Sequence, residues 1–248
     1  MLLILTYHRI VEQGTSIRDF FDVSAHELAA HLGLVKNTWG KGLSPEALQR
    51  EQSRGRRERA GFLVTFDDGT TDHYFAAAPV LERYGLRGVF FVSTSLLETA
   101  GYLTLRQCQE LQARGHAIES HAHEHKALVG LPAEELARQL SESRRRLREA
   151  GLGRWDWLAA PGGYFDAAVL QAASGAGYRA VRTLEWGYNR TLNPFRVESI
   201  CINRRTAGRW FGPLVSPHCE AVKKAFYRAK EALKRRVPAL YAGLRTGR

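Results

Sequence analysis

Gly61-Phe62-Leu63-Val64-Thr65-Phe66-Asp67-Asp68-Gly69 is an apolar run that ends in two carboxylates and a glycine. The β-branched and aromatic residues of the run predict a buried strand. Gly69 permits a sharp turn after the strand, so that both carboxylates can face one cavity. Adjacent ionised carboxylates repel each other, and a neighbouring cation relieves that repulsion. An isolated Asp-Asp-Gly is also typical of a solvated turn before a helix, so the rest of the chain must decide between these interpretations.

Strands and helices are predicted to alternate along most of the chain. We expect strands at 2–7, 61–67, 88–92, 116–120, 157–160, 178–182 and 197–202. Helices are expected at 24–35, 72–84, 104–115, 132–150 and 166–176, with a further short one starting at Ser44-Pro45. Such alternation predicts a parallel sheet with right-handed crossovers. We therefore expect one α/β barrel domain over residues 1–212, followed by a basic amphipathic helical tail over 213–248.

Polar and turn-forming residues follow the predicted strands at their carboxyl ends. They are His8, Asp67, Asp68, His121, His125, Pro161-Gly162-Gly163, Trp186 and Asn203. In a parallel β/α barrel these ends share one face, and that face carries the chemistry. The sequence therefore predicts one site built from several strand ends.

The segment from His116 to His125 contains four histidines. His121 and His125 have the His-x3-His spacing that lets two imidazoles converge on one ion. One carboxylate from Asp67-Asp68 would add an oxygen ligand and leave positions open for water and substrate. A histidine cluster alone is also compatible with a surface loop. Its combination with Asp-Asp-Gly at a neighbouring strand end favours a metal site.

Composition excludes several classes of protein. The net charge is +11, but residues 213–248 hold nine Lys/Arg and only two Glu, so the basicity is mostly a property of the tail. We find no nucleic-acid-binding motif beside it and expect no nucleic-acid partner. Cys108, Cys201 and Cys219 form neither a zinc motif nor a disulfide framework.

The amino terminus lacks the features of a signal peptide, and the chain has no apolar run long enough to span a membrane. We therefore expect a cytoplasmic location. The tail leaves two interpretations open, because its apolar positions recur at helical spacing among lysines and arginines. The helix either docks on the barrel or makes a peripheral contact with anionic lipid at the inner face of the membrane.

Three motifs carry a resemblance to a known family. Thr65-Phe66-Asp67-Asp68-Gly69, His121-x3-His125 and Pro161-x-Gly163 resemble the first three motifs of the polysaccharide deacetylase family, the NodB homology domain of carbohydrate esterase family 4. Tyr7-His8-Arg9-Ile10 resembles the start of its exopolysaccharide-processing members. The resemblance covers about residues 2–205. It implies a distorted (β/α)7 barrel, a divalent metal (commonly zinc, with cobalt or nickel as alternatives), and hydrolysis of N-acetyl groups on an amino-sugar polysaccharide or glycolipid.

The resemblance also implies roles for individual residues. Asp67 would be the general base, while Asp68, His121 and His125 would hold the metal. Contacts with the substrate are expected from Tyr7, Pro161, Gly162, Gly163, Tyr164 and Trp186.

The sequence departs from the family pattern in three places. Ala122 replaces the usual Ser or Thr, and Ala159 replaces the usual Arg that orients the base, for which Arg182 and Arg204 are candidate substitutes. The strand at 197–202 is not followed by the usual catalytic-acid histidine. His8 is the histidine expected on the same barrel face, so we assign it the acid role. A hydrogen bond from His8 to substrate, with His123 or water as the acid, is the alternative.

Two other functions compete with a deacetylase. The missing motif residues would suit a catalytically weakened, glycan-binding relative. Two histidines and a carboxylate also describe the site of non-haem iron oxygenases, although the order of the motifs on this barrel favours a hydrolase.

Overall fold

The computed structural model describes residues 1–12, 19–44 and 61–218, together with Glu46, Glu220, Lys224, Ala225 and Tyr227. Seven parallel strands form one curled sheet in the order β8-β7-β6-β5-β4-β1-β9. Their bounds are β1 Leu2–Tyr7, β4 Gly61–Phe66, β5 Gly88–Val92, β6 Ala117–Ser120, β7 Trp157–Ala159, β8 Ala180–Arg182 and β9 Ile200–Cys201. The predicted strands and their parallel pairing are therefore confirmed.

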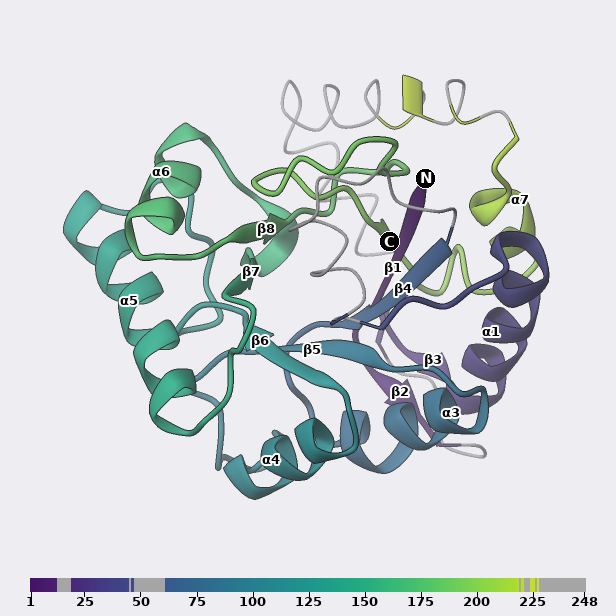
Figure 1. The fold of residues 1–248 in the computed structure, drawn as a ribbon, viewed down its shortest axis with the longest axis horizontal. Helices are drawn as coiled ribbons and strands as arrows, with labels where there is room; N and C mark the ends of the chain where they lie inside the picture. Colours follow the sequence, from purple (N-terminus) through teal and green to yellow (C-terminus); the bar gives the residue numbers. More distant parts are fainter. Residues whose placement is uncertain are drawn as a thin grey trace, which may run out of the picture.

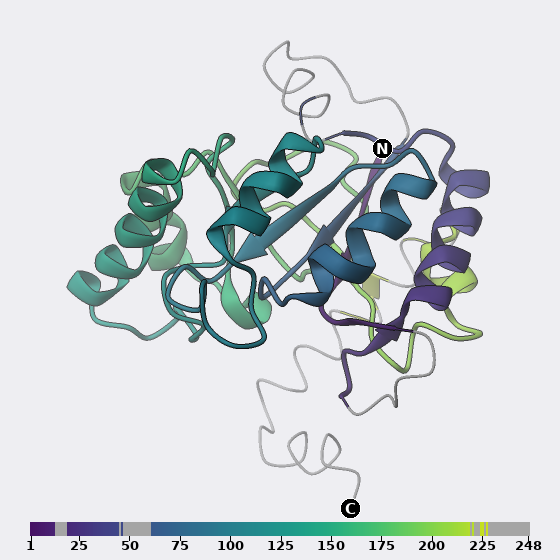
Figure 2. The same cartoon turned by 90° about the horizontal axis from the view of Figure 1, so that it is seen from below.

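Helices cover the outside of the curled sheet. They are α1 Ala25–Trp39, η1 His73–Ala77, α3 Ala78–Arg83, α4 Leu105–Ala113, α5 Ala133–Glu149 and α6 Ala167–Gly175, with α7 Phe211–Val215 after the last strand. Figure 1 shows α1, α3, α4, α5 and α6 surrounding the strands in chain order, as right-handed crossovers require. Figure 2, turned by 90°, shows α3 and α4 lying across the front of the strands. The arrangement is that of the expected distorted (β/α)7 barrel.

The strands have apolar side chains on both faces because both faces are covered. Along β1, Leu3, Leu5 and Tyr7 pack in a cluster with residues of α1, whereas Leu2 and Ile4 pack in a second cluster inside the barrel. This alternation follows from the two-residue period of a strand. Alternate side chains along a strand thus pack either against a helix or in the barrel interior.

The barrel closes at an irregular seam between β8 and the segment that leads into β9. An isolated parallel bridge joins Arg182 to Val197 there. The first strand is held on both sides, since β1 pairs with β4 along its whole length and with β9 at Leu5 and Thr6. Closure therefore joins the beginning of the chain to residues about 200 positions later.

Two helices begin with the capping boxes that sequence chemistry favours. The Ser24 hydroxyl accepts from the backbone N–H of Glu27, whose carboxylate accepts from the Ser24 N–H, and Thr104 and Gln107 repeat the pattern at α4.

Two features were not predicted. The helix after Asp67-Asp68-Gly69 starts as a π-helix, η1, before continuing as α3. A small second sheet, β2 Ile10–Val11 paired with β3 Val23–Ser24, was also not predicted.

The tail prediction falls mostly outside the described residues, as does the short helix predicted at Ser44-Pro45. Three described tail residues contact the segment after β8: Glu220 pairs with Arg190, Lys224 with Glu198, and Tyr227 stacks on Trp186. These contacts favour docking of the tail on the barrel, and a membrane contact stays a prediction. None of the helices in the described ranges has the length and apolar character needed to cross a lipid bilayer.

Candidate active site

The turn after β4 separates the two adjacent carboxylates. Asp68 and Gly69 both have left-handed backbone conformations, with φ of 78° and 75°. Asp tolerates this region better than most residues do, and Gly69 is required because a Cβ there would lie 2.8 Å from Cγ1 of Val92. As a result Asp67 is directed into the protein, where it is buried, and Asp68 is directed toward the end of β6.

Asp68, His121 and His125 converge on one point. Oδ1 of Asp68 lies 3.4 Å from Nε2 of His121 and 3.0 Å from Nε2 of His125, and one ligand atom from each residue lies within 4.8 Å of the others. Nδ1 of His121 contacts the Ala159 carbonyl at 2.8 Å. Donation to that carbonyl fixes the imidazole so that Nε2 presents its lone pair to the centre.

The three residues fit a divalent metal ion. Oδ1 of Asp68 is buried and, within the part of the chain that the structure describes, makes no aligned hydrogen bond. A carboxylate oxygen facing two imidazole nitrogens is a donor set suited to zinc, cobalt or nickel. Burial raises the pKa of the Asp68 carboxyl, but contacts with the His121 and His125 imidazoles outweigh it and hold the pKa well below its usual range. Asp68 is thus a carboxylate, as a metal ligand must be.

Each oxygen of Asp67 faces a different side chain. Arg182 donates from Nη2 to Oδ1, and Nε2 of His8 lies 3.9 Å from Oδ2. Arg182 is completely buried, with its guanidinium carbon 5.1 Å from the centre of the Phe91 ring. Of the two candidate substitutes for the family arginine, Arg182 therefore reaches Asp67. Arg204 instead pairs with Glu27 at the start of α1.

His8 lies next to Asp67 because β1 and β4 are in register. Tyr7 pairs with Phe66, and the Asp67 N–H donates to the Tyr7 carbonyl at 2.9 Å. Nε2 of His73, in the π-helical turn, contacts the His8 carbonyl at 2.6 Å. Burial lowers the pKa of His8, while the charges of Asp67 and Asp68 raise it in part.

Side chains also enclose the His8 ring. Phe21 stacks on the imidazole with a centroid distance of 4.3 Å. Sγ of Cys201 lies 4.0 Å from Nδ1. Neither neighbour was identified from the sequence, since Phe21 precedes a short strand and has no motif around it.

Two predicted substrate contacts are not supported by the structure. Tyr7 is completely buried between β1 and α1, and its hydroxyl bonds to Nδ1 of His31 at 3.1 Å. Trp186 is buried in the same apolar cluster, against Tyr188. We correct both to core residues, because their side chains pack on the helix side of the sheet rather than at the site.

The remaining predicted contacts lie at the end of β7. Pro161, Gly162 and Gly163 form a short 3-10 turn, η2, followed by the exposed Tyr164. Gly163 has a φ of 74°, and a Cβ there would lie 2.6 Å from the Leu184 side chain. This turn follows directly on the Ala159 carbonyl that holds His121, so it lies at the same ends of the strands as Asp68, His121 and His125.

Three other residues noted in the sequence have structural partners. Nδ1 of His123 bonds to Oγ1 of Thr94 at 3.0 Å. The side-chain oxygen of Asn203 accepts from the Arg205 N–H in a turn. Ala122 is buried with a φ of 63°, and its N–H donates to Oγ of Ser120.

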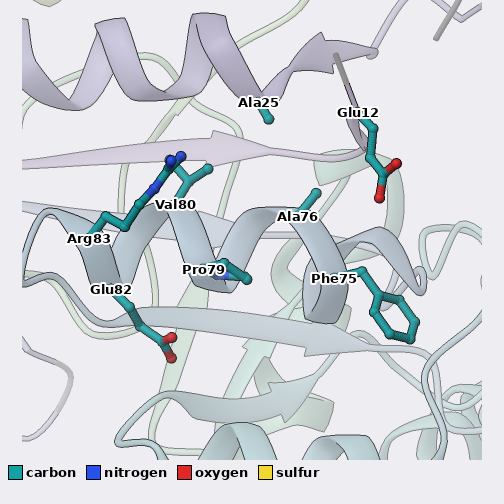
Figure 3. Close-up of a pocket in the computed structure, with 8 residues that line it drawn as sticks. All are labelled: Glu12, Ala25, Phe75, Ala76, Pro79, Val80, Glu82 and Arg83. Atoms are coloured by element: carbon teal, nitrogen blue, oxygen red, sulfur yellow. The ribbon is translucent and has the colours of Figure 1, made fainter. Parts of the chain in front are cut away.

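A surface pocket between α1 and the η1–α3 helix is separate from this site (Figure 3). Phe75, Ala76, Pro79, Val80 and Arg83 line it, together with Glu12, Ala25 and Glu82. The predicted site residues are not among them.

Comparison with known proteins places this geometry in a family. Residues 54–181, just over half of the chain, match the family described as Polysaccharide deacetylase. The chain belongs to the polysaccharide deacetylase family. The match includes Asp67, Asp68, His121, His125 and the Pro161 turn, but neither His8 nor Arg182. The predicted family and enzyme class are therefore confirmed.

Individual relatives agree with this assignment. YxkH of Bacillus subtilis, named as a polysaccharide deacetylase, is 29% identical over 86% of this chain and 76% of its own length. The structure of the deacetylase PplD of Streptococcus pyogenes, in complex with acetate, superposes with a TM-score of 0.75 at 23% identity, covering 87% of this chain and 98% of PplD. IcaB of Ammonifex degensii gives a TM-score of 0.74 at 22% identity, covering 85% and 97%. These two structures show that the deacetylase shares their fold.

Proposed function

We propose that this deacetylase is a metal-dependent hydrolase that removes N-acetyl groups from an amino-sugar-containing polysaccharide or glycolipid. The observation that carries the proposal is the convergence of Asp68, His121 and His125 beside the buried carboxylate of Asp67. Family membership supports the reaction class. The acetate in the PplD structure is the other product of such a reaction, and it supports the proposal by analogy.

Asp68, His121 and His125 would hold the metal, with zinc the first choice and cobalt or nickel as alternatives. A divalent cation supplies Lewis acidity toward the amide carbonyl when it is bound. The chain contributes the orientation of its ligands. His121 is fixed by the Ala159 carbonyl, whereas His125 is half-exposed at the open side of the site.

Asp67 is suited to act as general base. Because Arg182 occupies Oδ1, the proton is accepted by Oδ2. Asp67 takes a proton from water, whose oxygen attacks the acetamide carbon, and the carbon–nitrogen bond then breaks. The departing amine must receive a proton, because an amide anion is too basic to leave. His8, 3.9 Å from Oδ2 of Asp67, is the proposed donor, and acetate and a free amino sugar are the products.

The competing functions have less support. A weakened glycan-binding relative was suggested by the absence of the base-orienting arginine at Ala159, but Arg182 contacts Asp67. A non-haem iron oxygenase would share the ligand set, and membership of a deacetylase family argues against it.

Acetate release from N-acetylated chitooligosaccharides, measured with added zinc, cobalt or nickel, tests the proposal. We expect metal-dependent acetate release by the wild type, and loss of both bound metal and activity in His121→Ala, since each ligand is one of three from the protein. Glycan binding without acetate would support the binding relative, and oxygen-dependent turnover the oxygenase. A metal-replete, fully active His121→Ala variant would refute the assigned site.

A further inference from the structure

A pair of aromatic residues, the half-buried Phe21 and the exposed Phe20, extends outward from the proposed acid. Phe21 stacks on His8 at 4.3 Å, and Phe20 meets Phe21 edge to face, with a centroid distance of 5.1 Å and an interplanar angle of 80°. Phe20 is 38% exposed, so part of its ring is open to solvent and available for contact with a ligand. The two rings thus lie in a row between solvent and the His8 imidazole, which is beside Asp67.

The turn that carries this pair is fixed by polar contacts. The Phe21 N–H donates to Oδ1 of Asp19, and the Asp19 N–H donates to Oδ2 of Asp22, each at 2.9 Å. Asp22 is buried and lies 3.5 Å from Nε of Arg9. Contacts within the turn therefore set the direction in which the two rings project.

A second contact ties the turn to the segment after β9. The Phe20 carbonyl accepts from the Arg204 N–H at 2.9 Å. The Arg205 guanidinium lies 5.7 Å from the centre of the Phe20 ring. An exposed ring on an anchored turn loses little conformational freedom when a ligand stacks on it.

We propose that Phe20 and Phe21 form a sugar-binding subsite, in which the apolar face of a pyranose ring adjacent to the reacting N-acetyl sugar stacks on Phe20. This inference rests on the proposed function and extends it to a specificity-determining residue. A sugar ring has an apolar C–H face suited to an aromatic ring, and its hydroxyls can accept from the neighbouring Arg205. Because Phe21 stacks on His8, a ligand that contacts Phe20 would lie next to the proposed reaction site. This position favours a sugar of the substrate chain as the occupant.

The chain offers a matched control. Tyr74 and Phe75 form an edge-to-face pair with the same 5.1 Å centroid distance and an angle of 83°. Phe75 is 61% exposed, but it lies at the surface pocket beside α1 and not against His8 (Figure 3). Phe75→Ala therefore removes an exposed aromatic ring of the same kind without touching the proposed subsite.

Steady-state kinetics on N-acetyl-chitopentaose and on free N-acetylglucosamine test the proposal. We expect Phe20→Ala to raise KM for the pentasaccharide by about 5- to 10-fold with little change in kcat, as expected for a lost stacking contact. KM for the monosaccharide and the melting temperature should not change. Phe20→Tyr should restore the wild-type KM and Phe20→Leu should not, because leucine keeps the apolar bulk but not the aromatic face. Phe75→Ala should match the wild type.

Binding provides a readout that does not need turnover. In an Asp67→Asn background, calorimetric titration with the pentasaccharide should show weaker binding when Phe20→Ala is added. If the enzyme fails to release acetate yet this difference persists, the proposed reaction is wrong and the subsite stands. The subsite is refuted if Phe20→Ala leaves pentasaccharide KM and binding unchanged, if leucine restores them as well as tyrosine, or if Phe20→Ala lowers kcat equally for both substrates.

Discussion

Arg182 and Asp67 form a buried charged contact between β8 and the end of β4, 115 residues apart in the chain. Arg182 is the direct register partner of Ala159 on β7. Ala159 stands where the family pattern usually has an arginine, and here a guanidinium from the neighbouring strand reaches Asp67, the proposed base. Neither Nε nor Nη1 of Arg182 has a hydrogen-bond partner among the described residues. Asp67 is therefore the group that compensates its buried charge.

The first prediction concerns this contact. Arg182→Ala should retain bound metal but lose activity by about 100-fold, because the base is no longer oriented. Breaking a buried ion pair also costs about 3–5 kcal/mol of folding free energy, so melting temperature and metal content must be measured beside acetate release.

A relocation variant separates orientation from stability. Side chains at partner positions of neighbouring parallel strands project to the same face. Ala159→Arg in the Arg182→Ala background should therefore recover activity. Wild-type rates in Arg182→Ala, or a folded double variant without recovery, would contradict the role of Arg182.

The second prediction separates the two adjacent carboxylates. Asp67→Asn should keep the metal and lose at least about 100-fold in rate, as expected when a general base is removed. Metal content measured on the same preparation decides the outcome. If metal and activity disappear together, Asp67 is a ligand and the roles of Asp67 and Asp68 must be exchanged.

The third prediction concerns the acid. His8→Ala should retain metal, lose at least about tenfold in rate, and lose one limb of the pH–rate profile. His123→Ala is the control, because His123 lies between the metal ligands in sequence but bonds to Thr94. A wild-type profile in His8→Ala, with the limb lost in His123→Ala, would transfer the role to His123.

The fourth prediction concerns stability at the opposite end of the barrel. Burial lowers the pKa of His116 from 6.5 to about 4, although the carboxylate of Glu82 raises it in part. Nδ1 of His116 accepts from the Gly88 N–H at 3.1 Å, while Nε2 lies 3.0 Å from the Glu82 carboxylate. The folded protein therefore holds the neutral imidazole.

Because the unfolded chain binds the proton more readily, His116 contributes its stability above pH 6.5. That contribution is lost as the pH falls from 6.5 toward 4, up to about 3 kcal/mol. His116→Gln should flatten the dependence of the urea midpoint on pH in this window. An unchanged slope in the variant would show that other groups control it.

The sequence predicted the elements whose signals are local. The strand ending in Asp67-Asp68-Gly69 and the helices that begin at Ser24 and Thr104 depend on residues close in the chain. His121 and His125 could be placed because they follow one strand at a spacing of four. These features can be predicted without knowing which residues pack against them.

Side-chain direction and long-range contacts were harder to predict. Tyr7 was expected to contact the substrate. It lies on the same face of β1 as Leu3 and Leu5, however, and its side chain therefore packs toward α1. This alternation of side chains along the strand was visible in the sequence. The partner of Arg182 was not, because a three-residue strand gives no signal for the carboxylate that its arginine will meet. Phe21 likewise acquires a role only through the register of β1 and β4.

The position of the barrel seam has a consequence for the order of refolding. The three proposed metal ligands follow β4 and β6, which both pair with β5. Arg182 lies at the seam, and His8 follows the strand that pairs with β9. Contacts between distant parts of a chain form slowly, because closing a long loop costs entropy before the contact stabilises it. During refolding the deacetylase should therefore regain metal affinity before it regains catalysis, and the return of catalytic activity would mark the moment at which the first strand meets the last.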